Sequence, residues 1–357
     1  MKRLAVVLLL LLSALPALAA DTLSLTILHT NDLHGMVLPF AYANRNVSPT
    51  FRHGQMGGLA RRAALIARMR RTARNPVVVV DAGDIFTRGP WHTRFYGIPE
   101  VEAMNAMGYD AACVGNNELK ATEDTRAQGY LLALVRRSKF PWLAANLTVG
   151  DTGVPVDGIH PFIVRRLAGV RVGFLGLTSA RAAAYPSTKG WTISDPIQAA
   201  GRWVPIARRE CDILIAVTHI TFLLDMELAR RVPGIDAIVG GDSHTFLWSP
   251  LMVRNPDGHL VPIVQAGEQG VALGKLDLLF DRAGGWHLVS ARGKLIPVDD
   301  SVPEDPAVHR LVASYVGPYT VATPHKAVPR RMVRQAKRPA PLRRSRPPAK
   351  HHAPAAR

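Results

Sequence analysis

Acidic, imidazole and amide side chains gather in five short segments of this sequence, each at the end of an apolar run. The segments are His29–Gly35, Asp81–Asp84, Gly115–Glu118, Thr218–His219 and Gly240–His244. Carboxylate oxygens combined with imidazole nitrogens suit divalent ions such as manganese, iron or zinc. Two such ions about 3.5–4 Å apart can clamp a phosphoryl group and activate a water molecule. One histidine or one Gly-Asp pair would be an ordinary structural feature, but five such segments together indicate metal-dependent hydrolysis.

The apolar runs before these segments are short, uninterrupted and rich in Val, Ile and Leu, which is typical of strands covered on both faces. Predicted strands are Leu23–Leu28, Val77–Asp81, Ala111–Val114, Trp142–Ala145, Val172–Leu177, Ile213–Thr218, Ala237–Val239 and Pro262–Gln265. Predicted helices are Gly58–Arg71, Pro99–Met107, Thr125–Arg137, Pro196–Arg209 and Leu223–Arg231. The order is mainly βαβ, with hairpins near Phe162–Gly173 and Leu273–Lys294, which predicts the α/β class. Open α/β sheets place ligands at the carboxyl ends of their strands, so we expect the five segments to meet at one edge.

Composition excludes several classes of protein. The chain has 357 residues, 48% of them hydrophobic, and two cysteines. This composition excludes a mainly disordered protein and a disulfide-dense miniprotein. The formal net charge of +17 is uneven, because residues 324–357 hold 11 Lys/Arg and no acid, and Lys2 and Arg3 add two more. The body of the chain is left with a charge of about +4, so a basic, nucleic-acid-binding globular surface is not indicated.

The N-terminus has the layout of a secretory signal peptide over residues 1–20. Lys2 and Arg3 precede the apolar run Leu4–Leu12, and Ala17-Leu18-Ala19 offers the small residues of a cleavage site. The run is short for a membrane span, which needs about 20 residues. We expect a periplasmic or secreted protein that begins near Ala20 or Asp21 and has no transmembrane segment in the mature chain.

The C-terminus differs in kind from the rest of the chain. We expect a catalytic domain over residues 21–300, its extension over 301–323, and a disordered tail over 324–357. The tail has seven prolines and hardly any large apolar residue, so it cannot bury enough surface to offset its ordering entropy. Contact with an anionic surface or polymer, and a solvated tail without a partner, are equally compatible with this composition.

Three further features are expected to have structural roles: the two cysteines, a long connection and one acidic residue. Cys113 and Cys211 lie at or near predicted strands, which favours two small core residues over a disulfide. Residues 36–56 show little periodicity and are expected to form a long connection at the mouth of the site. Glu118, next to the amide pair of its segment, is expected to brace the loop and not to bind metal.

The polar segments together resemble the calcineurin-like metallophosphoesterases, in particular the 5'-nucleotidase branch. The resemblance covers roughly residues 23–300 and rests on the blocks LTILHTNDLHG, VVVVDAGDIF, VGNNE, VTHI, GGDSH and PIVQAG. It implies a four-layer αββα sandwich and a dinuclear site for two divalent ions (manganese, zinc, iron or similar). It also implies a small phosphorylated substrate, hydrolysed by attack of metal-bound hydroxide on a phosphate ester.

The same resemblance assigns the metal ligands. Asp32, His34 and His244 would bind the first ion, and Asp84 would bridge both ions. The ligands of the second ion would also include three residues of later blocks: Asn116, His219 and Asp242. Asp242 stands where the family commonly has a histidine, and its carboxylate would favour a harder ion.

A catalytic dyad of the family is missing. The family's third block usually reads Gly-Asn-His-Glu, with an Asp two places later, and its His stabilises the transition state or protonates the leaving group. Here these positions are Asn117 and Lys120, and loss of a positioned acid typically costs about 10²–10⁴-fold in rate. A catalytically weakened metal- or phosphate-binding protein is therefore an alternative to the hydrolase.

The substrate is not fixed by the resemblance. Full-length 5'-nucleotidases have a C-terminal domain whose aromatic residues stack on the base, and here the sequence turns basic and Pro-rich where that domain would begin. A further alternative is a thiosulfohydrolase-like enzyme, since a related exported branch hydrolyses a sulfur-containing bond at a similar site.

Overall fold

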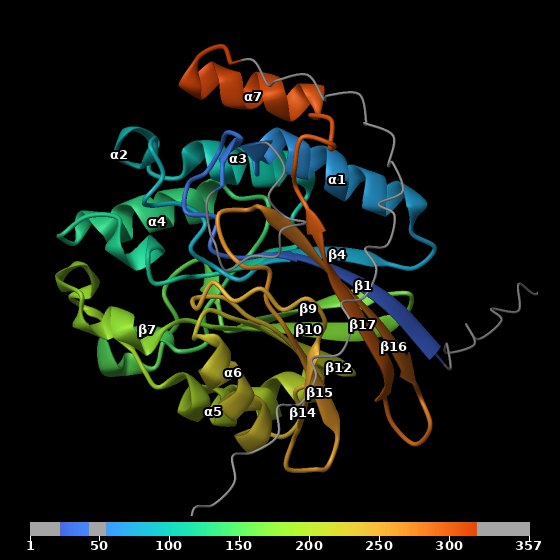
Figure 1. The fold of residues 1–357 in the computed structure, drawn as a ribbon. Helices are drawn as coiled ribbons and strands as arrows, with labels where there is room; N and C mark the ends of the chain where they lie inside the picture. Colours follow the sequence, from blue (N-terminus) through green and yellow to red (C-terminus); the bar gives the residue numbers. More distant parts are fainter. Residues whose placement is uncertain (1–21, 43–54, 320–357) are drawn as a thin grey trace, which may run out of the picture. The chain divides into compact units, whose positions relative to one another are not determined.

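Two β-sheets pack face to face in this protein, and helices cover the outer face of each sheet (Figure 1). The structure is a computed structural model that describes residues 22–42 and 55–319. The predicted signal peptide, the predicted basic tail and residues 43–54 of the predicted long connection lie outside the described residues.

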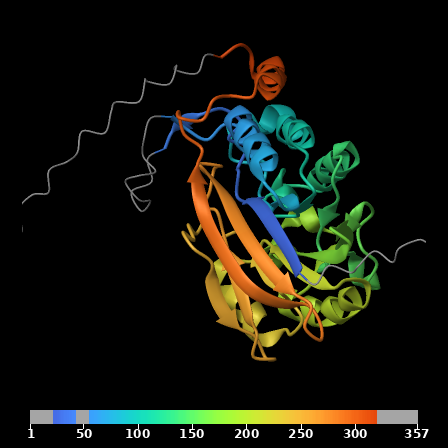
Figure 2. The ribbon, with the colours of Figure 1, turned by 90° about the vertical axis from the view of Figure 1, so that its right-hand side faces the viewer.

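The first sheet has seven strands and contains the N-terminal strand near its middle. Its order is β17 (His287–Pro297), β16 (Ala272–Asp281), β1 (Thr22–Thr30), β4 (Val77–Asp81), β5 (Ala111–Cys113), β6 (Trp142–Leu143) and β8 (Ile159–His160). Strands β1, β4, β5, β6 and β8 are parallel, whereas β16 runs antiparallel to β1. Figure 2 shows the long β16–β17 hairpin in orange beside the blue β1.

The second sheet has six strands and, like the first, combines a central run of parallel strands with antiparallel strands. Its order is β14 (Leu251–Arg254), β15 (Leu260–Val264), β13 (Ala237–Val239), β12 (Ile213–Thr218), β10 (Val170–Leu177) and β9 (Phe162–Leu167). Strands β10, β12, β13 and β15 are parallel, and β9 and β14 pair antiparallel at the two edges. Five parallel strands of the first sheet and four of the second therefore present their carboxyl ends to loops.

Three hydrophobic clusters hold the layers together. Side chains of β1, β4, β10 and β12 meet between the sheets. Helices α1 (Leu59–Thr72), α3 (Ile98–Met107), α4 (Arg126–Arg137) and α7 (Pro306–Val316) contribute to the cluster on the outer face of the first sheet. Helices α5 (Pro196–Glu210) and α6 (Phe222–Arg231) cover the second sheet. The predicted four-layer αββα sandwich is confirmed.

Short elements occupy the connections between these layers. They are β2 (Phe40–Ala41), β3 (Gln55–Met56), α2 (His92–Phe95), β7 (Leu147–Val149), β11 (Trp191–Ile193) and the 3₁₀ turns Glu118–Lys120, Gly150–Thr152, Ala180–Ala184 and Pro186–Thr188. No helix among the described residues is long and apolar enough to cross a membrane.

Local sequence predicts most of these elements well. Strands over Val77–Asp81, Ile213–Thr218 and Ala237–Val239 have the predicted bounds, since buried β-branched runs favour strands in any packing. Both hairpins are present. Helix α7 was not predicted, although Asp305 caps it by accepting bonds from Ala307 N and Val308 N at 2.9 and 3.0 Å, and such an Asp-Pro start is a recognisable helix signal.

The two cysteines are free thiols in the core, as the sequence favours. Cys113 ends β5, and its thiol donates to Leu177 O at 3.3 Å. Cys211 follows α5, and burial raises the pKa of its thiol to about 11. Burial likewise raises the pKa of the Cys113 thiol.

We expect neither thiol to react with Ellman's reagent in the native protein at pH 8, because both are buried and uncharged at that pH. After unfolding in guanidinium without reductant, two thiols per chain should react. An unfolded chain that releases no colour without reductant, and the full amount with it, would show a disulfide and contradict this prediction.

Candidate metal centre

Carboxyl ends of parallel strands from both sheets bring the predicted ligands together. Asp32 and His34 follow β1, Asp84 follows β4, and the other predicted ligands follow β5, β12 and β13: Asn116, His219, Asp242 and His244. Hydrogen bonds and ion pairs connect all seven side chains, six directly and Asn116 through Arg181. The predicted edge of the sandwich is therefore one site.

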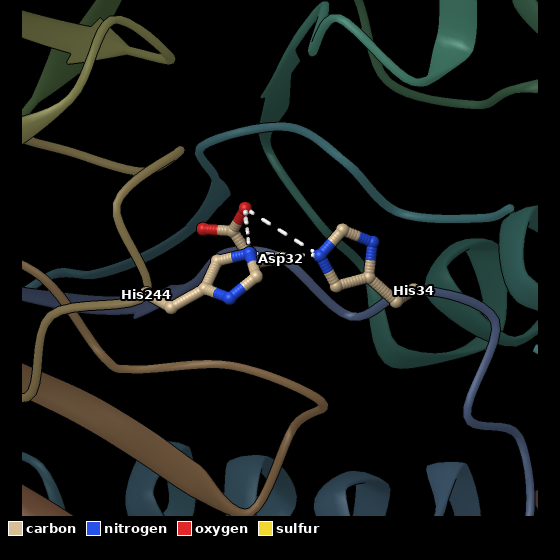
Figure 3. Close-up of side chains that lie close together, drawn as sticks. All are labelled: Asp32, His34 and His244. Carbon is tan, nitrogen blue, oxygen red and sulfur yellow. Dashed lines mark hydrogen bonds and ion pairs between the residues drawn. The ribbon is translucent and has the colours of Figure 1, made fainter. Parts of the chain in front are cut away.

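The first group consists of Asp32, His34 and His244 (Figure 3). Asp32 Oδ1 lies 3.8 Å from His34 Nε2 and 3.3 Å from His244 Nε2. The two Nε2 atoms lie 3.0 Å apart. Two imidazole nitrogens and a carboxylate oxygen at this separation form a set that fits one divalent ion.

The second group shares Asp32 and adds Asp84 and His219. His219 Nε2 lies 3.2 Å from Asp84 Oδ1, 4.0 Å from Asp32 Oδ1 and 3.8 Å from Asp242 Oδ1. The other ring nitrogen, Nδ1, is 2.7 Å from Ala82 O. This contact makes Nδ1 a donor and points Nε2 at the carboxylates, which is the usual orientation of a ligating histidine once Nε2 has lost its proton.

Three buried polar atoms at this point have no hydrogen-bond partner among the described residues. They are Asp32 Oδ1, His219 Nε2 and Asp242 Oδ2. The other oxygen of Asp32 is engaged, since Oδ2 accepts from Asn31 Nδ2 at 2.7 Å and from Asp242 N at 3.0 Å. Buried polar atoms are rarely left unpaired, because each one costs free energy. The residues present thus fit a divalent cation that these atoms would share.

The charges of the site are strongly coupled. Burial lowers the pKa of His34 to about 4, against the opposing effect of Asp84 and Asp32, so this ring is neutral at pH 7, as a metal ligand must be. Burial alone would lower the pKa of His244, but the adjacent carboxylates of Asp32 and Glu268 raise it to about 9. The carboxylate charge that holds this proton would attract a cation in the same way.

Asp84 and His219 stabilise each other's charged forms. Burial opposes the charge on each side chain, yet the His219 imidazole lowers the pKa of Asp84 below its ordinary value. Asp84 in turn raises the pKa of His219 well above its ordinary value. Asp84 is therefore ionised, and a bound metal ion would have to displace the proton of His219.

The backbone at the site is conformationally constrained. Five of the seven predicted ligands have a left-handed φ angle: Asp32 (51°), His34 (49°), Asp84 (57°), Asp242 (77°) and His244 (54°). Such residues typically cost about 1–3 kcal/mol and cluster at functional sites. A Cβ atom on Gly83 or Gly241 would lie 2.9 Å from His219 Nδ1, so glycine at both positions allows the loops to approach this ring.

Glu118 braces the loops without facing the metal groups, as predicted. Its carboxylate is fully buried and accepts bonds from Asp84 N, Ile85 N and Gly115 N at 2.9, 2.8 and 2.7 Å. It therefore ties the loop after β5 to the loop after β4. These bonds fix the backbone that presents Asp84.

The substituted dyad residues take other roles in the structure. Asn117 donates from its backbone N to Asp84 Oδ1 at 2.8 Å and from its side chain to the other oxygen of Asp84. Lys120 is exposed, and its Nζ lies 5.4 Å from the ring centroid of Tyr185. Asn117 thus holds Asp84 in place, and Lys120 makes a cation–π contact at the rim of the site.

Two residues at the site were not found from the sequence. Glu268 Oε2 lies 3.0 Å from His244 Nδ1, which directs the Nε2 atom of that ring toward Asp32. Arg181 forms an ion pair with Asp242 and donates to Asn116 Oδ1 at 3.0 Å. Both follow parallel strands, β15 and β10, so the rule that found the other segments applies to them as well.

Fold and site define a class: a four-layer α/β protein with a cluster of carboxylates and imidazoles, suited to divalent metal, at the carboxyl ends of its strands. Residues 25–246 match the family model described as calcineurin-like phosphoesterase. The chain belongs to this family.

Relatives with known names agree with this assignment. A human 5'-nucleotidase is 33% identical over 308 residues, which cover 81% of this chain and 52% of the human protein. The crystal structure of a 5'-nucleotidase precursor from Thermus thermophilus has a TM-score of 0.72 and 28% identity, covering 82% of this chain and 58% of that one. The sulfate thiohydrolase SoxB of the same species has a TM-score of 0.70 but 20% identity, covering 85% and 62%, and so shares the fold. This chain spans about half the length of the human protein.

We expect Glu118→Ala to lower the free energy of unfolding by about 3 kcal/mol or more, because three buried backbone N–H groups lose their acceptor. Glu118→Gln keeps one acceptor oxygen and should lose less. Urea denaturation followed by circular dichroism measures both. The control is Glu123→Ala, since Glu123 is exposed in the same loop region. A Glu118→Ala variant as stable as this control would refute the bracing role.

Proposed function

We propose that this chain is an exported, metal-dependent phosphoric ester hydrolase with 5'-nucleotidase-like chemistry, acting on a small phosphorylated molecule. The observation that carries the proposal is the convergence of Asp32 Oδ1, His219 Nε2 and Asp242 Oδ2, all buried and unpaired, where two potential metal groups share Asp32. The names of the human and Thermus relatives support the substrate class.

The chain's own residues have distinct tasks in this proposal. Asp32, His34 and His244 would hold one divalent ion, and Asp84 would serve both ions, as the resemblance implies. Three further residues would hold the second ion: Asn116, His219 and Asp242. When bound, the two ions supply an activated water and stabilise negative charge that develops on the phosphoryl oxygens. Glu268 and Ala82 O orient the His244 and His219 rings.

We also propose the domain limits and the location that the sequence predicts. Residues 1–20 direct export to the periplasm or the exterior, residues 21–300 form the catalytic domain, and residues 301–323 extend it. The basic tail 324–357 either contacts an anionic surface or polymer or is solvated without a partner.

One observation favours a second candidate, a metal- or phosphate-binding protein with little turnover. Asn117 holds both oxygens of Asp84 at the position where the family has a proton-donating histidine. An amide has no proton to transfer at neutral pH, so the leaving group would depart without a side-chain acid.

We expect manganese-loaded protein to release nitrophenol from a phosphomonoester or phosphodiester analogue, and Asp84→Ala to reduce the rate more than about 100-fold, beyond the usual effect of an outer partner. Asp257→Ala, which removes an exposed carboxylate, is the matched control and should keep full activity. Equal rates for Asp84→Ala and the control would contradict the metal-dependent mechanism. Absence of turnover in a metal-loaded wild type would favour the binding protein.

We expect the double variant Asn117→His/Lys120→Asp to raise kcat by about 10²-fold, because it supplies the missing acid and the carboxylate that orients it. Asn117→His alone should gain less, since its ring would have no oriented partner. Steady-state kinetics on both nitrophenyl esters test this, with Lys120→Asp as the control. A double variant no faster than wild type would show that leaving-group protonation does not limit the rate.

A further inference from the structure

A guanidinium group lies at the second half of the metal centre. Arg181 belongs to the 3₁₀ turn Ala180–Ala184 after β10, and its side chain is 59% exposed. It reaches inward to Asp242, whose side chain is 2% exposed, and forms an ion pair with Oδ1. The same nitrogen donates to Asn116 Oδ1 at 3.0 Å.

Both partners of Arg181 are residues expected to bind the second ion and not the first. Asn116 Oδ1, which it contacts, is the amide oxygen that a metal ion would use. Asp242 Oδ1, which it also contacts, lies 3.8 Å from His219 Nε2, whereas Asp242 Oδ2 has no hydrogen-bond partner among the described residues. In contrast, Asp32 and Asp84 form ion pairs with histidines alone among the described residues. Among the described residues, the arginine ion pair of the centre therefore lies in its second half, while Arg88 acts on His34 without an ion pair to its carboxylates.

The neighbouring residues hold this arrangement in place. Asn116 Nδ2 donates to the Tyr185 hydroxyl at 3.2 Å, so the amide of Asn116 is turned with its oxygen toward Arg181. Tyr185 follows the same short turn as Arg181. One segment after β10 thus supplies both the cation and the group that orients its acceptor.

The identity of residue 242 explains why an arginine is present. A neutral histidine at this position would bind metal but would not attract a guanidinium, whereas the Asp242 carboxylate does both. The Asp242–Arg181 pair is charge-assisted, and Arg can donate to two acceptors at fixed angles. The extra negative charge at residue 242 and the positive charge at residue 181 neutralise each other.

We propose that Arg181 competes with the second metal ion for Asn116 and Asp242, so that the protein holds one ion firmly and the second only weakly. The inference rests on the proposed metal centre and concerns the relative affinity of its two halves. The Arg181 side chain can move away from the site, because it is more than half exposed and its guanidinium would be solvated outside the site. The second ion must displace it, and that displacement weakens binding.

Titration of the full chain with manganese alone tests the inference. Free Mn²⁺ is followed by electron paramagnetic resonance after removal of bound metal with a chelator. We expect Arg181→Ala to tighten binding of the second ion by about tenfold or more, since a charge-assisted bond no longer has to be broken, and to leave the first ion unchanged. Arg181→Lys keeps the positive charge but loses the planar guanidinium with its several N–H donors, so its affinity for the second ion should lie between those of wild type and Arg181→Ala.

Two further variants control the result. Arg126→Ala removes an exposed arginine that pairs with Asp124 and should leave both affinities unchanged. In an Asp242→His background the anchor of Arg181 is gone, so adding Arg181→Ala should then change the second affinity by less than about twofold. Circular dichroism confirms that each variant is folded.

The inference would be overturned if Arg181→Ala bound the second manganese ion no more tightly than wild type. It would also be overturned if Arg126→Ala changed that affinity as much as Arg181→Ala does. The inference would likewise be overturned if Arg181→Ala changed the affinity for the second ion equally in the wild-type and the Asp242→His backgrounds. Because the titration contains no substrate, a protein that shows the predicted shift yet hydrolyses neither nitrophenyl ester would support the inference and refute the proposed function. A wild type and an Arg181→Ala variant that both bind no manganese would refute both.

Discussion

The fully buried carboxylate of Asp32 is the interaction on which the site depends. Its Oδ2 atom is fixed by Asn31 and by the backbone N–H of Asp242, which joins a loop of the first sheet to a loop of the second. Its Oδ1 atom faces the imidazoles of His34, His219 and His244. One oxygen of this carboxylate thus accepts hydrogen bonds between the loops, and the other faces the site. The geometry of the centre therefore depends on how the two sheets pack.

Negative charge at this depth has to be balanced, and the protein does so unevenly. Histidines accompany Asp32 and Asp84, and His219 and His244 can give up a proton when a cation arrives. Asp242 is paired with Arg181, whose guanidinium would have to move away. The two halves of the centre therefore differ in what a metal ion must displace.

Much of the fold follows from local sequence. Buried Val- and Ile-rich runs such as Val77–Asp81 and Ile213–Thr218 form strands with the predicted bounds, because residues covered on both faces have little alternative. The extension over 301–323 was expected without an element, and it contains α7. Its apolar residues Val308, Leu311 and Val312 recur at helical spacing and pack in the cluster outside the first sheet, so this helix was available to sequence reasoning.

The sequence by itself determined the fold class, the segments that carry the chemistry and the residue types available to a metal, because strand patterns and strand-end motifs are local. Only the tertiary structure decided which oxygen of Asp32 is free, that Asn117 is bound to Asp84, and that Arg181 reaches Asn116 and Asp242. These contacts join residues from different strands and, in two of the three cases, from different sheets. Their geometry depends on how the layers pack, which no short segment specifies.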